Sequence, residues 1–551
     1  MLIPRGQSYD EIYRGFRWNI PPRYNIAADV CDRHAATRPD DIALIHETGD
    51  GALRRYSFRQ IQREANRLAN TLLEYGAGLG DRVLIQLGQD PATAIGHVAC
   101  WKAGIISIPT SELFGADALE YRLSNSGAQI VITNRANYPK FVELRNRIAP
   151  LKAIFLVDGE GPAAISLVDA MQRASDSFTT LALDPETPAF ISYTSGTTGP
   201  PKGTLHAHRV LLGHMPGVEF MFDFFPQPGD IMWSPADWAW LAGLFDILMG
   251  AWFHGRPVLS YRTVAFDAQQ ALHMMGKHEV RTALLTPTML KMIRQAPEPL
   301  SRFGVRLRSV LTGTEAAGKD LLEWGSRALG VNINEGFGQT EYNMCLGNCS
   351  LVLPQRSGSL GRLVPSHVGA VIDSVGNILP PGEIGQIAFR RPHPVMMLRY
   401  WNNEQATADK FIGDWLVTGD LGRVDEEGYF WFCGRADDVI TSSGYRIGPG
   451  EIEDALLRHP AVAMAAVIGV PDPIRTEAIK AFIVLAKGCE SSDVLAESIR
   501  ETVRSRLARH ECPREFEFID SMPMTTTGKL RRGALREAER ARRVARSSPT
   551  T

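Results

Sequence analysis

The stretch that decides the fold is Tyr193-Thr194-Ser195-Gly196-Thr197-Thr198-Gly199-Pro200-Pro201-Lys202-Gly203, which follows the strand-like run Pro188-Ala189-Phe190-Ile191-Ser192. Its glycines let the backbone turn tightly and expose N–H groups. The hydroxyls of Thr194, Ser195, Thr197 and Thr198 add side-chain donors, and Lys202 adds positive charge. Together these groups predict a cradle for a triphosphate. The G-x-x-x-x-G-K-[ST] spacing of a Walker A loop is absent, so the loop is of another kind.

The whole-chain composition excludes several classes of protein. With 551 residues, of which 44% are hydrophobic and 22% charged, the chain predicts a globular protein of two or more domains. The net charge of −2 implies no general attraction to nucleic acid or to an anionic membrane. No apolar stretch reaches the ~18 residues that a membrane span needs. Asp246 interrupts the apolar run at residues 241–252, which we expect to be buried core.

The seven cysteines are spread thinly from Cys31 to Cys512. Their odd number and wide spacing do not fit a disulfide framework or a zinc site. The first residues contain no apolar run of the kind that a secretory signal has. We therefore expect reduced thiols and a cytoplasmic location.

The first part of the chain alternates between helical and strand patterns. Ile61, Ala65, Leu68 and Leu72 share one face of a predicted helix. Short apolar runs typical of buried strands follow at residues 82–87, 105–108, 129–132 and 153–157. Helical stretches between such strands predict βαβ units with parallel pairing, so the fold class is α/β.

The pattern changes near residue 370 and again after Gly434. Short strands separated by glycine and proline turns first predict a small antiparallel β subdomain, and mixed helices and strands then predict a small α+β domain. The expected subdomain strands lie at residues 371–373, 387–389 and 429–432, and the later elements at 452–457, 462–470, 479–485 and 494–507. We therefore expect domains at residues 1–434 and 435–551.

Four further motifs follow the glycine-rich loop. They are Asn334-Glu335-Gly336-Phe337-Gly338-Gln339-Thr340-Glu341, Thr418-Gly419-Asp420, Gly434-Arg435-Ala436-Asp437-Asp438-Val439-Ile440 with Ser443-Gly444-Tyr445-Arg446-Ile447, and Thr526-Thr527-Gly528-Lys529. In this order, the five motifs resemble those of the adenylate-forming superfamily, which comprises acyl-CoA synthetases, luciferases and nonribosomal-peptide adenylation domains. The chain is most similar to the short- and medium-chain acyl-CoA synthetases.

The resemblance implies a set of catalytic residues for attack of a carboxylate on the α-phosphorus of ATP. Lys529 is expected to stabilise the reacting oxygens, Thr340 to lie near the α-phosphate, and Lys202 to bind phosphate. Glu341 is expected to bind Mg²⁺, because a hard cation prefers carboxylate and phosphate oxygens. Both reactants are anions, so the chemistry requires this positive charge.

The resemblance also assigns the nucleotide contacts. Asp420 can accept hydrogen bonds from both ribose hydroxyls, and Arg435 is expected nearby. Phe337 would offer adenine an aromatic face. Ala316 departs from the usual family pattern at its position. The complete expected set is Thr194, Ser195, Gly196, Thr197, Thr198, Gly199, Thr314, Glu315, Ala316, Glu335, Gly336, Phe337, Gly338, Thr340, Asp420, Arg435 and Arg446.

Coenzyme A and a moving C-terminal domain are implied as well. Asp437 matches the hinge about which the C-terminal domain rotates to bring Lys529 in and to withdraw it. Ser443 and Gly444 are expected at the pantetheine arm, since glycine allows a ligand to approach the backbone. Trp240 matches an aromatic wall of the pantetheine tunnel, with a position in the core as the alternative.

The acyl pocket is expected to be open and apolar. Gly338 stands where acetate-activating relatives have a tryptophan, and Gly313 stands where they have a valine. A tryptophan side chain buries ~150–250 Å², so its absence leaves room. Leu241 and Ala242 are expected to line the same pocket, which carries no lysine or arginine. His206 and His208 follow the glycine-rich loop and are either gating residues or simply polar.

The function that follows is an AMP-forming acyl-CoA synthetase. We expect it to convert a short- or medium-chain fatty or related apolar acid, ATP and coenzyme A through an acyl-adenylate. An adenylation enzyme that loads a carrier-protein thiol is the alternative, although no carrier-like Asp-Ser-Leu segment follows Lys529. A catalytically inactive nucleotide-binding relative is a third interpretation. An acetyltransferase and a deacetylase acting on Lys529 are possible partners, and the sequence leaves the oligomeric state open.

Overall fold

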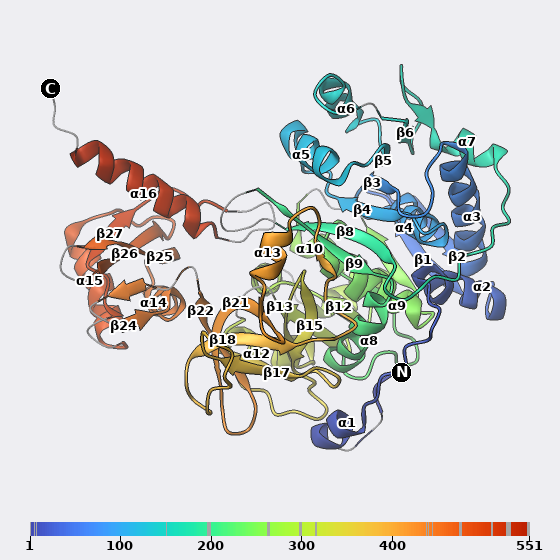
Figure 1. The fold of residues 1–551 in the computed structure, drawn as a ribbon. Coiled ribbons are helices and arrows are strands. Elements are labelled where there is room, and N and C mark those ends of the chain that lie inside the picture. The colour runs from blue at the N-terminus through green and yellow to red at the C-terminus, as the bar shows by residue number, and fades with distance from the viewer. Residues whose placement is uncertain are drawn as a thin grey trace.

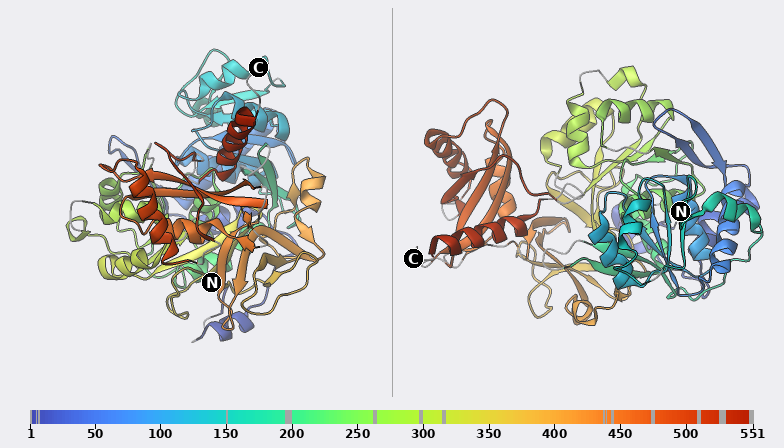
Figure 2. Two further views of the ribbon diagram at one scale, coloured as in Figure 1. Left: turned by 90° about the vertical axis from the view of Figure 1, so that its left-hand side faces the viewer. Right: turned by 90° about the horizontal axis from the view of Figure 1, so that it is seen from above.

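The computed structural model describes the chain except for residues 1, 5, 7, 150, 195–199, 262–264, 297–299, 314–316, 437, 439, 443–444, 473–475, 508–510, 525–529 and 548–551. The side chains of residues 441, 445, 446, 451 and 544–547 are also outside the description. Figure 1 shows a large body, coloured blue to orange, and a smaller C-terminal part that stands to one side of it. The right-hand view of Figure 2, from above, also shows the C-terminal part to one side of the body.

The first sheet has eight strands in the order β19-β9-β8-β4-β3-β5-β6-β7. The strands from β8 to β7 pair in parallel, and β8, β9 and β19 pair antiparallel. This sheet confirms the expected βαβ pattern. Its strands are β3 (Arg82–Gln86), β4 (Ile106–Thr110), β5 (Ile130–Thr133), β6 (Ala153–Leu156), β7 (Ile165–Ser166), β8 (Pro188–Thr194), β9 (Lys202–Ala207) and β19 (Arg399–Tyr400).

The second sheet has fourteen strands, thirteen of them in the order β17-β18-β21-β22-β16-β15-β14-β13-β12-β10-β11-β1-β2. Its first half is antiparallel, and its strands from β14 to β1 are parallel. The bounds of the parallel half and its end are β1 (Ile42–Glu47), β2 (Leu53–Ser57), β10 (Met232–Trp233), β11 (Val258–Tyr261), β12 (Thr282–Leu284), β13 (Ser309–Gly313) and β14 (Ile333–Gln339).

The antiparallel half is the β subdomain expected near residue 370. It comprises β15 (Tyr342–Gly347), β16 (Ser359–Leu363), β17 (Gly369–Ile372), β18 (Gly385–Arg390), β20 (Phe411–Ile412), β21 (Trp415–Val424) and β22 (Phe430–Arg435). The antiparallel pairing of β15 with β14 makes it continuous with the parallel half. The change of pattern in the sequence therefore marks a change of strand direction within one sheet.

Helices cover both sheets. In α3 (Phe58–Glu74), the four residues expected on one face are fully buried, and Ser57 with Gln60 forms a capping box. The other helices of the body are α1 (Tyr9–Gly15), η1 (Ala28–Asp32), α2 (Arg33–Thr37), α4 (Pro91–Lys102), α5 (Ala116–Ser126), α6 (Tyr138–Leu144), α7 (Leu167–Arg173), α8 (Val210–Met221), η2 (Ala242–Met249), α9 (Gly250–Phe253), α10 (Ala268–Lys277), α11 (Pro287–Arg294), η3 (Leu300–Phe303), α12 (Lys319–Trp324), η4 (Gly325–Leu329) and α13 (Glu404–Ala408).

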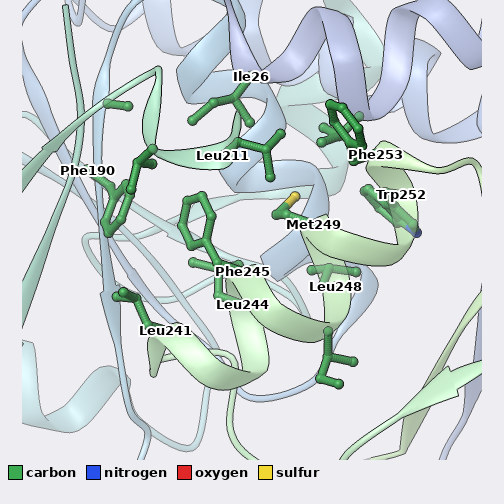
Figure 3. Close-up of a cluster of buried hydrophobic side chains, with 14 of the residues drawn as sticks. Ile26, Phe190, Leu211, Leu241, Leu244, Phe245, Leu248, Met249, Trp252 and Phe253 are labelled. Atoms are coloured by element: carbon green, nitrogen blue, oxygen red, sulfur yellow. The ribbon is translucent and has the colours of Figure 1, made fainter. Parts of the chain in front are cut away.

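The apolar run at residues 241–252 forms core, as expected. Most of it belongs to the π-helix η2, and Figure 3 shows Leu244, Phe245, Leu248 and Met249 among other buried side chains. Phe245 stacks on Phe190 of β8, with ring centroids 4.6 Å apart. The helix therefore connects the core directly to the strand that precedes the glycine-rich loop.

In the described residues of the C-terminal part, a five-stranded sheet packs with three α-helices. Its strands are β23 (Ile440–Ser442), β24 (Tyr445–Ile447), β25 (Val462–Asp472), β26 (Thr476–Leu485) and β27 (Glu515–Phe518), and its helices are α14 (Pro449–Leu456), α15 (Asp493–Arg504) and α16 (Arg532–Ser547). This confirms the expected α+β character. The large sheet ends at Arg435 and the small sheet begins at Ile440, so the chain passes from one to the other within a few residues.

A glycine contact positions the segment that leads into β19. Arg209 Nη1 donates to the carbonyls of His393, Pro394 and Met396. A Cβ placed on Gly213 of α8 would lie 2.2 Å from Val395 N and 2.6 Å from the carbonyl carbon of Pro394. Only a glycine lets α8 approach this backbone, which leads to Tyr400.

We expect Gly213→Ala to destabilise the protein by about 1–3 kcal/mol, because the added methyl group must push backbone aside. Gly96→Ala is the matched control in a buried helix, since the nearest atom to its Cβ would be the flexible tip of the Ile85 side chain at 3.1 Å. Urea unfolding of both variants measures the difference. Equal midpoints for the two would contradict the proposed close contact.

Candidate active site

The hairpin β8–β9 holds the ends of the glycine-rich loop. Thr194 pairs with Lys202 in the ladder, and Thr194 Oγ1 donates to the Lys202 carbonyl at 3.4 Å. Lys202 Nζ lies 5.2 Å from the centroid of the Tyr400 ring. Residues 195–199, which include Ser195, Gly196, Thr197, Thr198 and Gly199, lie outside the described residues.

Glu341 lies in the turn between β14 and β15, directly after Thr340. Its Oε1 accepts a hydrogen bond from the hydroxyl of Tyr400, and its carbonyl accepts one from Met397 N at 3.0 Å. Burial and the neighbouring Glu341 raise the pKa of Tyr400, so this hydroxyl remains a donor at neutral pH. The second carboxylate oxygen of Glu341 is not used in this contact.

Asp420 is only 4% exposed and is held by two partners. Arg435, which faces it across β21 and β22, lies 3.0 Å from Oδ1 through Nη1, and Gln339 Nε2 donates to Oδ2 at 2.7 Å. Burial raises the pKa of Asp420, while Arg435 and Lys410 act in the opposite direction. Each carboxylate oxygen can still accept a second hydrogen bond.

Lys410 is a member of this site that the sequence analysis missed. Its Nζ donates to Gln339 Oε1 at 3.3 Å and to the Thr418 carbonyl at 3.2 Å. Burial lowers the pKa of Lys410, and the nearby carboxylates of Glu341 and Asp420 offset part of this shift. Lys410 and Tyr400 lie outside every recognised motif, so no pattern in the sequence identifies them.

The structure thus brings together five charged side chains from five segments of the chain. They are Lys202, Glu341, Lys410, Asp420 and Arg435. Three are cations and two are carboxylates. Such a group suits a polyphosphate that arrives with its own negative charge. Among the residues that the structure describes, no group of three or more histidine, cysteine, aspartate or glutamate side chains could hold a metal ion. A divalent cation here would depend on phosphate oxygens as well as on protein.

The expected adenine residues lie where β13 and β14 pack closely. A Cβ on Gly336 would lie 2.9 Å from Met221 Sδ, and one on Gly313, which was expected to line the acyl pocket, would lie 2.6 Å from the carbonyl oxygen of Gly336. Glu335 is buried, and its Oε1 accepts a hydrogen bond from Ala317 N at 3.3 Å. Burial raises the pKa of Glu335 to about 7. Thr314, Glu315 and Ala316 lie outside the described residues.

The expected acyl residues lie at the start of η2 and at the end of β14. Leu241 is buried, whereas Trp240 and Ala242 are half-buried. The Trp240 and Phe114 rings meet edge to face, with centroids 6.1 Å apart. A Cβ on Gly338 would lie 2.5 Å from both Asn343 Oδ1 and Met344 N. Gly338 is therefore required by the approach of β15, a packing reason that the sequence did not reveal.

The two histidines after the glycine-rich loop are fully buried. His208 Nδ1 accepts a hydrogen bond from Ile26 N at 3.2 Å, and burial lowers the pKa of His208 to about 3. Burial lowers the pKa of His206 well below its ordinary value. Both are therefore neutral at physiological pH.

Several expected residues cannot be placed. Asp437, Ser443, Gly444 and Lys529 lie outside the described residues, as does the side chain of Arg446. Asp438, next to the expected hinge, is described and buried. Its carboxylate lies 3.3 Å from Arg532 Nη1 and 2.7 Å from Arg536 Nη2, both on α16.

Known proteins resemble this chain over most of its length. Residues 31–401 match the AMP-binding enzyme family, and residues 451–529 match the AMP-binding enzyme C-terminal domain. Acetyl-coenzyme A synthetase of Bacillus subtilis (strain 168) is 34% identical and covers 97% of this chain and 95% of its own. The human mitochondrial acyl-coenzyme A synthetase ACSM3 is also 34% identical, covering 97% of this chain and 92% of its own.

Solved structures of other proteins also superimpose on most of the chain. The anthranilate CoA ligase AuaEII, in complex with anthranoyl-AMP, superimposes with a TM-score of 0.85 at 29% identity, covering 95% of this chain and 99% of its own. ATP-bound MatB from Rhodopseudomonas palustris gives a TM-score of 0.82 at 26% identity, covering 93% and 98%.

The chain therefore belongs to the AMP-binding enzyme family. Within it, the chain is an AMP-forming acyl-CoA synthetase, an acid–thiol ligase that uses ATP and coenzyme A as substrates. The resemblance stated from the motifs is confirmed, and the carrier-loading alternative is not favoured. No helix in the described part of the chain is long and apolar enough to cross a membrane.

If Glu341 binds Mg²⁺, as the family resemblance implies, Tyr400→Phe should lower kcat/KM for ATP by about 10- to 100-fold and raise the Mg²⁺ concentration needed, because loss of an outer partner that orients a ligating carboxylate has effects of this size. Steady-state kinetics with a Mg²⁺ titration measure both. Tyr429→Phe is the control, because it removes a similar hydroxyl that donates to Pro354 at 2.9 Å. Wild-type kinetics in Tyr400→Phe would show that this hydroxyl does not orient Glu341.

A second expectation concerns pH and stability. The pKa of Glu335 rises from 4.5 to about 7 on burial. The folded chain therefore keeps this proton longer than the unfolded chain, and the free energy of unfolding falls as pH rises through that window. Glu335→Gln removes the effect and should be more stable than wild type by about 1–3 kcal/mol near pH 8.

Near pH 4 wild type and Glu335→Gln both carry a neutral side chain at position 335, so their urea midpoints should coincide. Glu383→Gln is the control at an exposed position and should show no pH-dependent difference from wild type. A constant difference between Glu335→Gln and wild type at every pH would mean that the carboxyl is not forced to keep its proton.

Proposed function

We propose that this enzyme activates a short- or medium-chain fatty or related acid. The acid's carboxylate attacks the α-phosphorus of ATP to give an acyl-adenylate and pyrophosphate, and the thiol of coenzyme A then displaces AMP. The observation that carries the proposal is the convergence of three cations and two carboxylates beside the glycine-rich hairpin. Anions can meet there without unfavourable repulsion.

In this proposal Lys202 binds phosphate and Thr340 lies near the α-phosphate. Asp420 accepts hydrogen bonds from the ribose hydroxyls. Its burial and the two donors that fix its orientation support this role. Lys410 adds charge and holds Gln339 in place. Glu335, Gly336 and Phe337, with residues 314–316, surround adenine.

Mg²⁺ is proposed to bind Glu341. The donor set fits, because Mg²⁺ usually takes one or two carboxylates together with substrate phosphates. Tyr400 occupies one carboxylate oxygen and leaves the other for the ion. When bound, Mg²⁺ neutralises the charge that develops on the phosphates.

We propose that domains 1–434 and 435–551 alternate between two arrangements, with Asp437 as the hinge. The support is the short passage from β22, which ends at Arg435, to β23, which begins at Ile440. Lys529 would act in adenylation, and Ser443, Gly444 and Arg446 would come to the site through the same domain. Trp240, half-buried and backed by Phe114, would line the path of coenzyme A.

Cellular context is proposed on chemical grounds. None of the seven cysteines, all of which the structure describes, forms a disulfide, which suits the reducing cytoplasm. Acetylation of Lys529 would remove the charge that adenylation needs, so an acetyltransferase and a deacetylase are proposed as regulatory partners.

The proposal predicts that the two half-reactions can be separated by mutation. Lys529→Ala should abolish acid-dependent pyrophosphate release with short- and medium-chain acids but leave thioester formation from supplied acyl-adenylate close to wild type. Gly444→Leu should do the reverse, because its side chain would obstruct the pantetheine arm. Single-turnover rates of both steps measure this. Equal loss of both steps in both variants would contradict domain alternation.

A further inference from the structure

A fully buried carboxylate ties the start of the chain to helix α8. Leu2 N donates to both carboxylate oxygens of Glu219 at 2.7 Å, and Ile3 N donates to Oε2 at 2.8 Å. His254 Nε2 lies 3.2 Å from Oε1. Figure 1 shows the N-terminus beside α8. A buried carboxylate is costly without such donors, so these contacts hold the first residues against the helix. We call the contacts of Leu2 and Ile3 with Glu219 the N-terminal latch.

Residues further along the N-terminal segment bind the opposite side of β15. The Tyr9 hydroxyl donates to the carbonyl of Leu363, the last residue of β16, at 2.7 Å. The Tyr13 hydroxyl donates to the His367 carbonyl, also at 2.7 Å. Because β16 pairs with β15, the N-terminal segment reaches from α8 to the strand next to β15. It is therefore anchored at both ends, unlike a terminus that frays.

The last turn of α8, which carries Glu219, depends on contacts outside the helix. Pro216 stands inside the helix. Proline has no N–H to donate to the carbonyl of Leu212, so the last turn has one hydrogen bond fewer to the first half of α8. Gly217 follows, and a Cβ placed on it would lie 2.5 Å from Met344 Cβ of β15. The turn is thus held by its packing on β15 and by the N-terminal latch.

The same turn supports the strand expected at adenine. Asn334 Nδ2 of β14 donates to the Met221 carbonyl at 2.9 Å. A Cβ on Gly336 would lie 2.9 Å from Met221 Sδ, so only the bare backbone of β14 fits against this side chain. Close-packed surfaces transmit small shifts. A displacement of Met221 would therefore move Glu335, Gly336 and Phe337, the residues proposed to surround adenine.

We infer that Glu219 is a positioning residue for the nucleotide, and that Leu2 and Ile3 hold it in place. The N-terminal latch acts on ATP binding through the last turn of α8 and does not touch ATP. The inference rests on the proposed placement of adenine beside residues 335–337. The latch supports the binding strand and not the reacting groups, so its loss should raise KM for ATP and leave kcat nearly unchanged.

The test replaces Leu2 by proline in the full-length enzyme. Leu2→Pro has no N–H at this position to donate to Glu219. Leu2→Ala keeps the N–H and is the matched control, since the Leu2 side chain is 38% exposed and its removal alone costs little. We expect KM for ATP to rise about 10-fold in Leu2→Pro, because a hydrogen bond to a charged group is lost. Its kcat and its KM for coenzyme A should stay within about two-fold of wild type, and Leu2→Ala should match wild type throughout.

Rates of CoA-dependent AMP formation with short- and medium-chain acids, together with calorimetric titration with ATP, measure these constants. A lower Tm with an unchanged affinity for ATP in Leu2→Pro would show that the latch only stabilises the fold, and would overturn the inference. If wild type binds ATP but forms no AMP with any of these acids, the proposed function fails. The calorimetric comparison of Leu2→Pro with Leu2→Ala still decides the inference in that case.

A measurement on the wild-type chain decides the inference even if Leu2→Pro does not fold. Coupling between two sites is reciprocal, so a latch that favours ATP binding must itself be strengthened by ATP. ATP should therefore slow hydrogen–deuterium exchange at the Ile3 amide by about 10-fold, the factor expected for KM. Exchange in α7, which follows β7 at the end of the first sheet, should not change. Unchanged exchange at Ile3 with ATP bound would overturn the inference.

Discussion

The site depends on the interaction of the buried Asp420 carboxylate with Arg435 and Gln339. A carboxylate at 4% exposure is costly to keep charged unless partners surround it. Arg435 provides one partner across a strand ladder, and Gln339 provides the other from the end of β14. The two contacts tie β14, β21 and β22 together, so the strand that leads to Glu341 is fixed relative to the strand that leads into the C-terminal domain.

Lys410 extends the same constraint. Its ammonium group binds the oxygen of the Gln339 amide whose nitrogen binds Asp420, and this fixes which way the amide points. The charges are thus arranged before any nucleotide arrives. Because the groups are already desolvated and oriented, the proposed polyphosphate ligand would meet positive charge without a large rearrangement of the protein.

The sequence predicted the features that short motifs encode. The βαβ order, the strands around the glycine-rich loop and the α+β C-terminal domain were all expected from periodicity, and Glu341, Asp420 and Arg435 from the motifs. Lys410 and Tyr400 were missed, because their role arises when segments far apart in the chain fold together. Gly338 was interpreted as leaving open space for the acyl group. It is also needed because β15 packs so closely that a Cβ would clash with it, a contact that the sequence does not encode.

The C-terminal domain shows how a local ion pair can connect two functional segments. Asp438 follows the expected hinge, and its carboxylate binds Arg532 and Arg536 at the start of α16. Arg532 also binds Glu453 of α14. The residues just before α16 include Lys529. A rotation about position 437 would therefore carry the start of α16 with it as one unit, because buried charge pairs are costly to separate. In the proposed domain alternation, these contacts would join the segment after the hinge to the start of α16.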